Sequence, residues 1–335
     1  MSKDVRLLTN LEGLQEYDVP WPRDWQARPP GLTAVLRVKN ESRSLPWVLP
    51  GLFRTAKAVV LVDNQSTDGT PEVARRVAEE CGASDRLTVT EYPFQVSRCG
   101  AEHLATPETS VHNLAYFYNW SFAHAKTRYS MKWDGDMVLT KEGEDTFADL
   151  AWQLETVEAV ISMPRHPLFV ESDRVAYLDV YMTNIEEYVY PMGADYRHVK
   201  AYEWEIRLVP PTAQKFRLPQ GLCVELKYLD GDEFDHWAGQ DLFGATDRTR
   251  RKLREWTVFH ALRDGRLEDA PGVVRIEAPE GYGHVISYVT DVWLPQQKRP
   301  IIIPPSQRPS DVPTPGLADP TGPPLHSDSV LPDAE

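Results

Sequence analysis

The amino-acid sequence predicts an α/β fold, with a mostly parallel central sheet lying between helices. Strand-like and helix-like segments alternate through the first half of the chain, and the strand-like ones, such as AVVLV at 58–62, are apolar throughout. Strands of this kind are buried on both faces, which is typical of parallel sheets covered by helices. Polar segments also follow the strands directly, at the strand ends where ligands of such sheets bind.

The elements expected in the first half follow from periodicity and from signals at helix ends. Between 43 and 56, apolar residues recur at helical spacing. Thr70 can cap a helix whose first residue is Pro71 and which stops at Gly82. In chain order, we expect strands at 33–38, 58–62, 86–90 and 129–133, and helices at 43–56, 71–81 and 113–125.

The two ends of the chain differ in composition from its middle. Residues 1–31 are expected to be an irregular lead-in, because YDVPWPRDWQARPPG holds too many prolines for a helix or a central strand. Residues 304–335 are rich in proline and small polar residues, cannot bury enough apolar area, and are expected to be a disordered tail. Between them lie a first half at 32–140 and a second half at 141–300, where strand-like and helical patterns mix.

Composition and charge argue against several classes of protein. The chain has 335 residues, 41% of them hydrophobic and 26% charged, which fits one large globular domain or two intimate ones. The formal net charge of −14 argues against a nucleic-acid partner held mainly by phosphate contacts. Scattered cysteines without CxxC spacing favour a reducing, cytoplasmic location. No apolar run approaches the roughly 20 residues of a membrane helix, so we expect no transmembrane segment.

Two acids interrupt what otherwise reads as a buried strand in YSMKWDGDMVL at 129–139. Only Gly135 separates Asp134 from Asp136, and burying an unpaired carboxylate is strongly unfavourable. Carboxylate oxygens bind Mg²⁺ and Mn²⁺, and Mg²⁺ keeps few protein ligands where phosphates supply the rest. The pair therefore predicts Mg²⁺ or Mn²⁺ together with a diphosphate, and the glycine is expected to leave room for the phosphates.

Three polar segments carry a resemblance to a known family. RVKNES at 37–42, VDNQSTDGTPE at 62–72 and DGD at 134–136 occur in this order, each at the end of an expected strand. They resemble the signatures of bacterial GT-A fold glycosyltransferases of family 2, with DGD as the DXD metal motif. The resemblance covers roughly residues 33–140 and is weaker to about residue 265.

The resemblance implies an enzyme that transfers a sugar from a nucleoside diphosphate donor to an acceptor hydroxyl, with inversion, in glycan or glycoconjugate biosynthesis. It makes 32–140 a Rossmann-like, nucleotide-sugar-binding half and 141–300 an acceptor-binding half with C-terminal helices. Asn64 and Gln65 depart from the commonest family pattern and leave the nucleobase open. By position, the donor residues would be Arg37, Lys39 and Glu41 in the nucleoside pocket, Asp63 and Asn64 at the base or ribose, and Asp134 and Asp136 at the metal and diphosphate.

The reaction also needs a base for the acceptor hydroxyl, and acids cluster in the second half. WEIRLV followed by LCVEL resembles a family pattern that places Glu225 as this base, with Asp232 as the second candidate. Val224 stands where the family usually has a histidine, and His236 is expected to replace it as a metal or diphosphate contact. Other acids of the second half stay open as alternatives: Glu203, Glu205, Asp230, Glu233 and Asp235.

Two other functions remain as alternatives. A sugar nucleotidyltransferase would also use an α/β nucleotide domain and a cation, but it would carry a glycine-rich loop after the first strand, and RVKNESRS has no glycine. A non-catalytic protein that binds sugar nucleotides or glycans would keep the fold without the base.

The basic run DRTRRKLRE at 247–255 has helical character and is expected to form a solvated face. Its alternative is peripheral contact with an anionic acceptor or a membrane surface.

Overall fold

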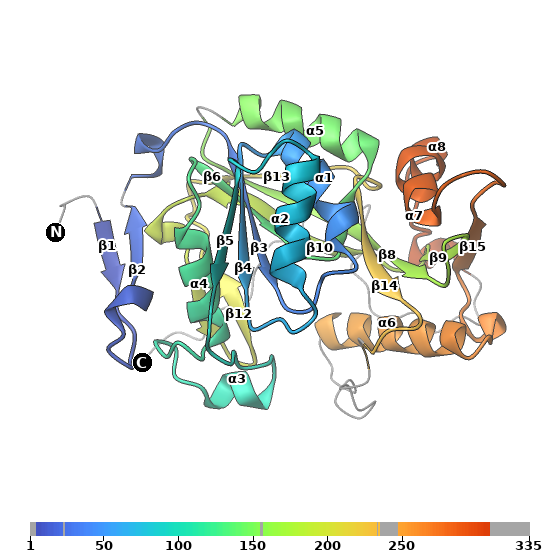
Figure 1. Cartoon of the computed structure of the whole chain (residues 1–335). Helices are drawn as coiled ribbons and strands as arrows, with labels where there is room; N and C mark the ends of the chain where they lie inside the picture. The colour runs from blue at the N-terminus through green and yellow to red at the C-terminus, as the bar shows by residue number, and fades with distance from the viewer. Residues whose placement is uncertain (1–4, 23, 155–156, 233, 235–246, 309–335) are drawn as a thin grey trace. The chain divides into compact units, whose positions relative to one another are not determined.

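The computed structural model describes residues 5–22, 24–154, 157–232, 234 and 247–308 (Figure 1). The chain falls into two compact units, and each is described by itself. The first unit comprises residues 1–163 and 186–218, and the second comprises residues 164–185 and 219–335.

A mostly parallel sheet forms the centre of the first unit. Its strands lie in the order β10-β6-β3-β4-β5, with β6, β3, β4 and β5 parallel and β10 antiparallel to β6. The predicted α/β fold, with a mostly parallel sheet flanked by helices, is confirmed. The bounds of these strands are β3 Leu32–Val38, β4 Ala58–Asp63, β5 Leu87–Glu91, β6 Tyr129–Trp133 and β10 Asn184–Pro191.

The helices of the first unit lie close to where the sequence places them. Asn113 caps α4, because its side chain accepts a hydrogen bond from the backbone N–H of Ala115. Thr70 is the first helical residue of α2 rather than its cap, and Gly69 takes the cap position. The bounds are α1 Leu45–Thr55, α2 Thr70–Glu80, α3 Ala101–Ala105, α4 Leu114–Ala123 and α5 Lys141–Gln153.

Two layers cover the sheet of the first unit. One core joins Val35, Val60 and Val62 of the sheet to the aromatic residues of α4 and to Trp21. Helices α1 and α2 pack against each other and against β4, and they lie in front of the strands in Figure 1. The central strands β3 and β4 are thus buried on both faces, as their apolar sequences predict, whereas β5 at the edge is only partly buried.

The described part of residues 5–31 is more regular than expected. Strand β1, Val5–Leu8, pairs antiparallel with β2, Val19–Pro22, and Leu7 lies opposite Pro20. A proline lacks a backbone N–H but is tolerated in an edge strand, which explains how a proline-rich segment pairs here. The remaining strands of the first unit are β7 Met137–Leu139, β11 His198–Ala201, β12 Trp204–Arg207 and β13 Gln214–Arg217.

The second unit contains the end of β8, Ala159–Val170, to which β14 pairs in parallel and β9 antiparallel. Strand β15 extends this arrangement beside β9. The basic run lies on α6, but Arg254 is not solvated, because it forms an ion pair with the fully buried Asp179 at 2.8 Å. The bounds are β9 Val175–Asp179, β14 Cys223–Tyr228, β15 Val273–Glu277, α6 Asp247–Arg263, α7 Val285–Tyr288 and α8 Leu294–Gln296.

None of the described helices is both long enough and apolar enough to cross a membrane. Residues 309–335, which make up most of the expected tail, lie outside the described residues.

The contact between Gly272 and Tyr181 gives a test of the second unit. Gly272 has φ +83°, and an added Cβ would lie 2.3 Å from the Tyr181 ring, so we expect Gly272→Ala to lower the free energy of unfolding by at least about 2 kcal/mol. Gly265→Ala is the matched control, because Gly265 has φ +71° but no atom within 4 Å of its added Cβ. Urea unfolding measures both, and equal losses would contradict the contact.

Candidate active site

Three polar loops lie at one edge of the sheet in the first unit. They follow β3, β4 and β6, which are neighbours, with Val38 opposite Asp63 and Leu36 opposite Trp133. The chain moves outward from β3 to β4 and β5, then returns to β6 on the other side of β3. The border between β3 and β6 is therefore the switch point at which open α/β sheets bind ligands.

The loops after β3 and β4 are joined by hydrogen bonds. The backbone N–H of Asn40 donates to Ser66 Oγ at 2.9 Å, that of Glu41 to Thr70 Oγ1 at 2.8 Å, and that of Ser42 to Asp68 Oδ2 at 3.0 Å. Three successive amides of the first loop are thus satisfied by side chains of the second.

The acidic loop approaches the loop after β3 closely at Gly135. An added Cβ there would lie 2.7 Å from Glu41 Cγ and 3.0 Å from Val38 Cγ1. The described neighbours of the glycine are therefore side chains of the first loop. This packing gives a reason for the glycine in the DGD motif that does not require a ligand.

Arg37 lies beneath Asp134 at the switch point. Its Nη2 is 3.2 Å from Asp134 Oδ1, and only 6% of its side chain is exposed, against 31% for Asp134. The guanidinium also stacks 3.6 Å from the centre of the Tyr118 ring of α4. Burial alone would lower the pKa of Arg37, but Tyr118 and Asp134 raise it by more. The arginine therefore stays charged and neutralises one carboxylate of the pair.

Two more buried cations extend this cluster. Lys132 Nζ lies 2.7 Å from Glu186 Oε2. Burial has the largest single effect and would lower the pKa of Lys132, but Glu186, Tyr118 and Asp134 together raise it by more. Arg207 Nη1 lies 3.9 Å from Glu187 Oε2, and burial lowers the pKa of Arg207. The cations lie deeper than their acidic partners, whose side chains are 29% and 32% exposed.

His198 completes the cluster as a neutral group. Arg207 Nη2 lies 3.1 Å from its Nε2, and a guanidinium can only donate, so Nε2 accepts and Nδ1 carries the hydrogen. Burial, followed by the nearby Arg207, holds the pKa of His198 well below its usual range.

Asp63 and Asn64 follow β4 at the same edge and differ in what they offer. Asp63 is buried, and its Oδ2 accepts from the Ser66 N–H at 3.2 Å, whereas its buried Oδ1 has no hydrogen-bond partner among the described residues. Asn64 Nδ2 donates to the backbone oxygens of Tyr92 and Phe94 at 2.9 and 2.7 Å. Asp63 Oδ1 is therefore a buried acceptor without a described donor, whereas Asn64 Nδ2 is occupied by two backbone oxygens.

The other expected donor residues differ in exposure. Lys39 is exposed, and Glu41, Asp134 and Asp136 are half-buried. Carboxylates at Asp134 and Asp136 suit Mg²⁺ or Mn²⁺, but within the described ranges no three His, Cys, Asp or Glu side chains gather closely enough to hold an ion. The remaining ligands of a bound cation would then be phosphate oxygens and water.

Glu225, the expected base, lies in the second unit on β14. Its side chain is 6% exposed, with Oε2 at 3.0 Å from Arg165 Nε and Oε1 at 2.9 Å from Lys227 Nζ. Burial would raise the pKa of Glu225, but Arg165 and then Lys227 lower it to about 2. So low a pKa makes the carboxylate a weak proton acceptor at neutral pH. Its assignment as the base stays a prediction.

The two other acceptor-side residues are less informative. Asp232 is exposed. His236 lies outside the described residues, as do the alternatives Glu233 and Asp235.

Sequence reasoning missed Tyr118, Lys132, Glu186 and Arg207. Lys132 could have been found from the strand period. Residues two apart in a strand lie on the same face, so Lys132 shares a face with Asp134 along β6 and its continuation. The others come from α4, β10 and β12, and nothing in the sequence pairs them with the DGD segment.

Comparisons with known proteins give distant similarities. No protein-family model matches the chain, and no curated protein matches it. A glucosyl-3-phosphoglycerate synthase from Mycobacterium tuberculosis, in complex with Mn²⁺, UDP and phosphoglyceric acid, is 15% identical over 42% of this chain and 44% of its own, with a TM-score of 0.27. A mannosyltransferase from Pyrobaculum calidifontis, in complex with GDP-Man and Mn²⁺, is 16% identical over 75% of this chain and 76% of its own, with a TM-score of 0.38.

The match to the synthase spans less than half of the length of that protein. TM-scores of this size do not establish a shared fold, so the function has to be inferred from the residues of this chain.

The link between the two loops depends on Asp68. We expect Asp68→Ala to lower the free energy of unfolding by about 1–2 kcal/mol at neutral pH, because the N–H groups of Ser42 and Thr70 lose their acceptor. Burial raises the pKa of Asp68, but hydrogen bonds from Thr70 and Ser42 lower it by more. A depressed pKa stabilises the fold above the unfolded value of about 3.9, and this stability is lost as the pH falls through the folded value.

Urea unfolding at a series of pH values measures this effect. The difference between wild type and Asp68→Ala should shrink at acid pH, and the exposed Asp85→Ala is the control. A difference that does not change with pH would contradict the role of the ionised carboxylate.

Glu225→Gln tests whether this carboxylate is structural. Two buried cations would lose their partner, so we expect the free energy of unfolding to fall by about 3–5 kcal/mol at neutral pH. Because the folded pKa is depressed to about 2, the wild-type contribution is present above about pH 4.3 and is lost as the pH falls towards 2.

Glu277→Gln is the control, because Glu277 pairs with Arg275 at 2.6 Å with both side chains about half exposed. If Glu225→Gln unfolds like wild type but turns over about 100-fold more slowly, the carboxylate acts as the proton acceptor instead.

Proposed function

We propose that the protein is a metal-dependent glycosyltransferase of the family 2 type, which moves a sugar from a nucleoside diphosphate to an acceptor hydroxyl with inversion. The observation that carries this proposal is the position of the DGD acids. They follow β6 beside the loops after β3 and β4, and Asp134 contacts Arg37 across the switch point. In this interpretation the protein takes part in glycan or glycoconjugate biosynthesis.

The donor would bind along the joined loops. The partnerless Asp63 Oδ1 suits a hydroxyl or N–H donor of the nucleoside. Arg37, Lys39 and Glu41 line the nucleoside end, and Asn64 supports the loop and contacts the base or ribose. Asp134 and Asp136 hold Mg²⁺ or Mn²⁺, which stabilises the charge that develops on the leaving diphosphate.

Arg37 gives Asp134 a defined position before the donor binds. An ion pair with a buried, stacked guanidinium restricts the carboxylate to few orientations, so less conformational entropy is lost on binding. The buried cations also reduce the repulsion between the half-buried acids above them.

The acceptor hydroxyl needs a base opposite the leaving group. We propose Glu225 for this role, with Asp232 as the second candidate and His236 as a contact to the metal or diphosphate. For Glu225 to act as the base, its ion pairs with Arg165 and Lys227 would have to loosen when substrates bind, because they depress its pKa.

A sugar nucleotidyltransferase is a weaker interpretation. Such an enzyme would hold a triphosphate through free backbone N–H groups in the loop after the first strand of its nucleotide domain. Here the N–H groups of Asn40, Glu41 and Ser42 already donate to side chains of the next loop.

A protein that binds a sugar nucleotide without turnover is the second candidate. The observation that favours it is the pairing of Glu225 with two cations, which leaves a weak proton acceptor. Metal-dependent nucleotide binding without product over a broad acceptor panel would distinguish it from an enzyme.

Asp136→Asn tests the proposed metal site. We expect nucleoside diphosphates to raise the melting temperature of the wild type in the presence of Mn²⁺, because a ligand that binds only the native state stabilises it. In Asp136→Asn this Mn²⁺-dependent shift should disappear, and kcat should fall by at least about 100-fold. Thermal shifts over a panel of nucleotides and transfer assays measure the two effects.

Asp85→Asn is the charge-matched control and should behave like wild type, because Asp85 is an exposed residue before β5. Full activity together with an unchanged Mn²⁺ effect in Asp136→Asn would overturn the metal assignment.

A further inference from the structure

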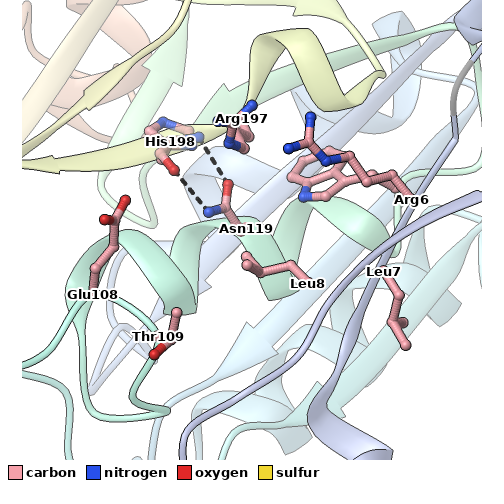
Figure 2. A pocket seen from close by; sticks show the side chains of 9 residues that line it. Arg6, Leu7, Leu8, Glu108, Thr109, Asn119, Arg197 and His198 are labelled. Carbon is pink, nitrogen blue, oxygen red and sulfur yellow. Dashed lines mark hydrogen bonds between the residues drawn. The ribbon is translucent and has the colours of Figure 1, made fainter.

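A hollow lies in the first unit, against the β1–β2 hairpin and α4 (Figure 2). It has a volume of about 280 Å³, close to the lower end of small-molecule pockets at roughly 300 Å³. Leu8 of β1 provides an apolar wall, whereas the side chain of its neighbour Leu7 points away from the hollow in Figure 2. None of the residues of the proposed donor site lines it, and of the buried cluster beside that site only His198 does.

Two arginines give this hollow a positive side. Arg6 of β1 and Arg197, just before β11, both line it, and in Figure 2 their guanidinium groups stand at its upper edge, away from Glu108. Arg197 donates to the backbone oxygen of Ala194 at 3.2 Å, but among the described residues neither arginine forms an ion pair with an acid. In a chain of net charge −14, two such guanidinium groups on one hollow favour an anion.

A buried donor points to the same conclusion. Trp21 lines the hollow and is 2% exposed, and its Nε1 has no hydrogen-bond partner among the described residues. A buried N–H without a partner lowers stability, and an acceptor atom of a ligand would satisfy it.

The opposite side of the hollow is held rigidly. Asn119 of α4 exchanges two hydrogen bonds of 2.8 Å with the backbone of His198, drawn as dashed lines in Figure 2. Glu108 Oε1 accepts from the Lys200 N–H at 3.3 Å, and its exposed carboxylate can also accept from a hydroxyl group. Arginines on one side and an acid on the other suit a ligand with an anionic end and a hydroxylated body.

We infer that this hollow is a second binding site, which takes a small hydroxylated anion such as a polyol phosphate or a hydroxy acid. The guanidinium forks of Arg6 and Arg197 hold the phosphate or carboxylate, and Trp21 Nε1 donates to it. Glu108 selects for hydroxyl groups on the body of the ligand. This site is independent of nucleotide and metal binding.

Calorimetry on the full-length protein tests the site with glycerol 3-phosphate, glycerate and uncharged glycerol. We expect at least one of the two anions to bind and glycerol not to bind. Arg6→Gln and Arg197→Gln should each weaken binding by about tenfold or more, because each removes a charge-assisted contact. Trp21→Phe should also weaken it, provided that circular dichroism shows a folded protein.

Two control variants distinguish binding in this hollow from non-specific attraction and from binding at the donor site. Arg75→Gln removes the same charge from an exposed helix position and should leave binding unchanged. Asp136→Asn should also bind normally, even if the proposed transferase activity proves wrong.

Three results would overturn the inference. The first is that neither anion binds to the wild type at about 10 mM. The second is equal weakening in Arg75→Gln, which would indicate non-specific attraction. The third is loss of binding in Asp136→Asn, which would place the anion at the donor site.

Discussion

The contact between Arg37 and Asp134 is the interaction on which the candidate site depends. It joins the ends of β3 and β6, the two neighbouring strands on either side of the switch point. The two carboxylates of the acidic loop would repel each other at this edge, and burial would cost them hydration. A nearby cation offsets both costs. Arg37 is this cation, and its guanidinium stacks on the Tyr118 ring. Lys132 is a second buried cation nearby, paired with Glu186.

A second constraint is the connection between the loops after β3 and β4. Because Ser66, Asp68 and Thr70 accept from three successive amides, the first loop has little freedom to rearrange. The same bonds consume the backbone donors that a phosphate-binding loop would present. In the proposed function, a cation held by the acids would supply phosphate affinity that these amides do not, which links the fold to the proposed metal dependence.

The second unit is organised around charge in a different way. Glu225 is enclosed by Arg165 and Lys227, so the acid that the sequence favours as a base is paired in the structure. Asp179 is likewise paired with Arg254. A buried ion pair satisfies its own charges and leaves little basicity for chemistry. The sequence alone does not show whether an acid is held in a buried ion pair, because its partners come from other segments of the chain.

Local sequence patterns were enough to predict the order and type of the central elements and the position of the acidic loop. Apolar runs such as AVVLV and helix-end residues such as Asn113 act locally, and for that reason β4 and α4 lie close to where they were predicted. Parallel pairing then placed Asp63 and Asp134 at one edge, because parallel strands share the direction of their carboxyl ends.

Which charges meet depends on the packing of segments that are far apart in the sequence. Tyr118, Lys132 and Arg207 are distant in sequence, and their convergence depends on how α4 and β12 pack against each other in the first unit. The pairing of Glu225 likewise depends on the register of β14 against β8, which brings Val224 opposite His166 and Glu225 close to Arg165. Periodicity fixes which face a side chain occupies, whereas its partner across that face is fixed by packing between distant segments.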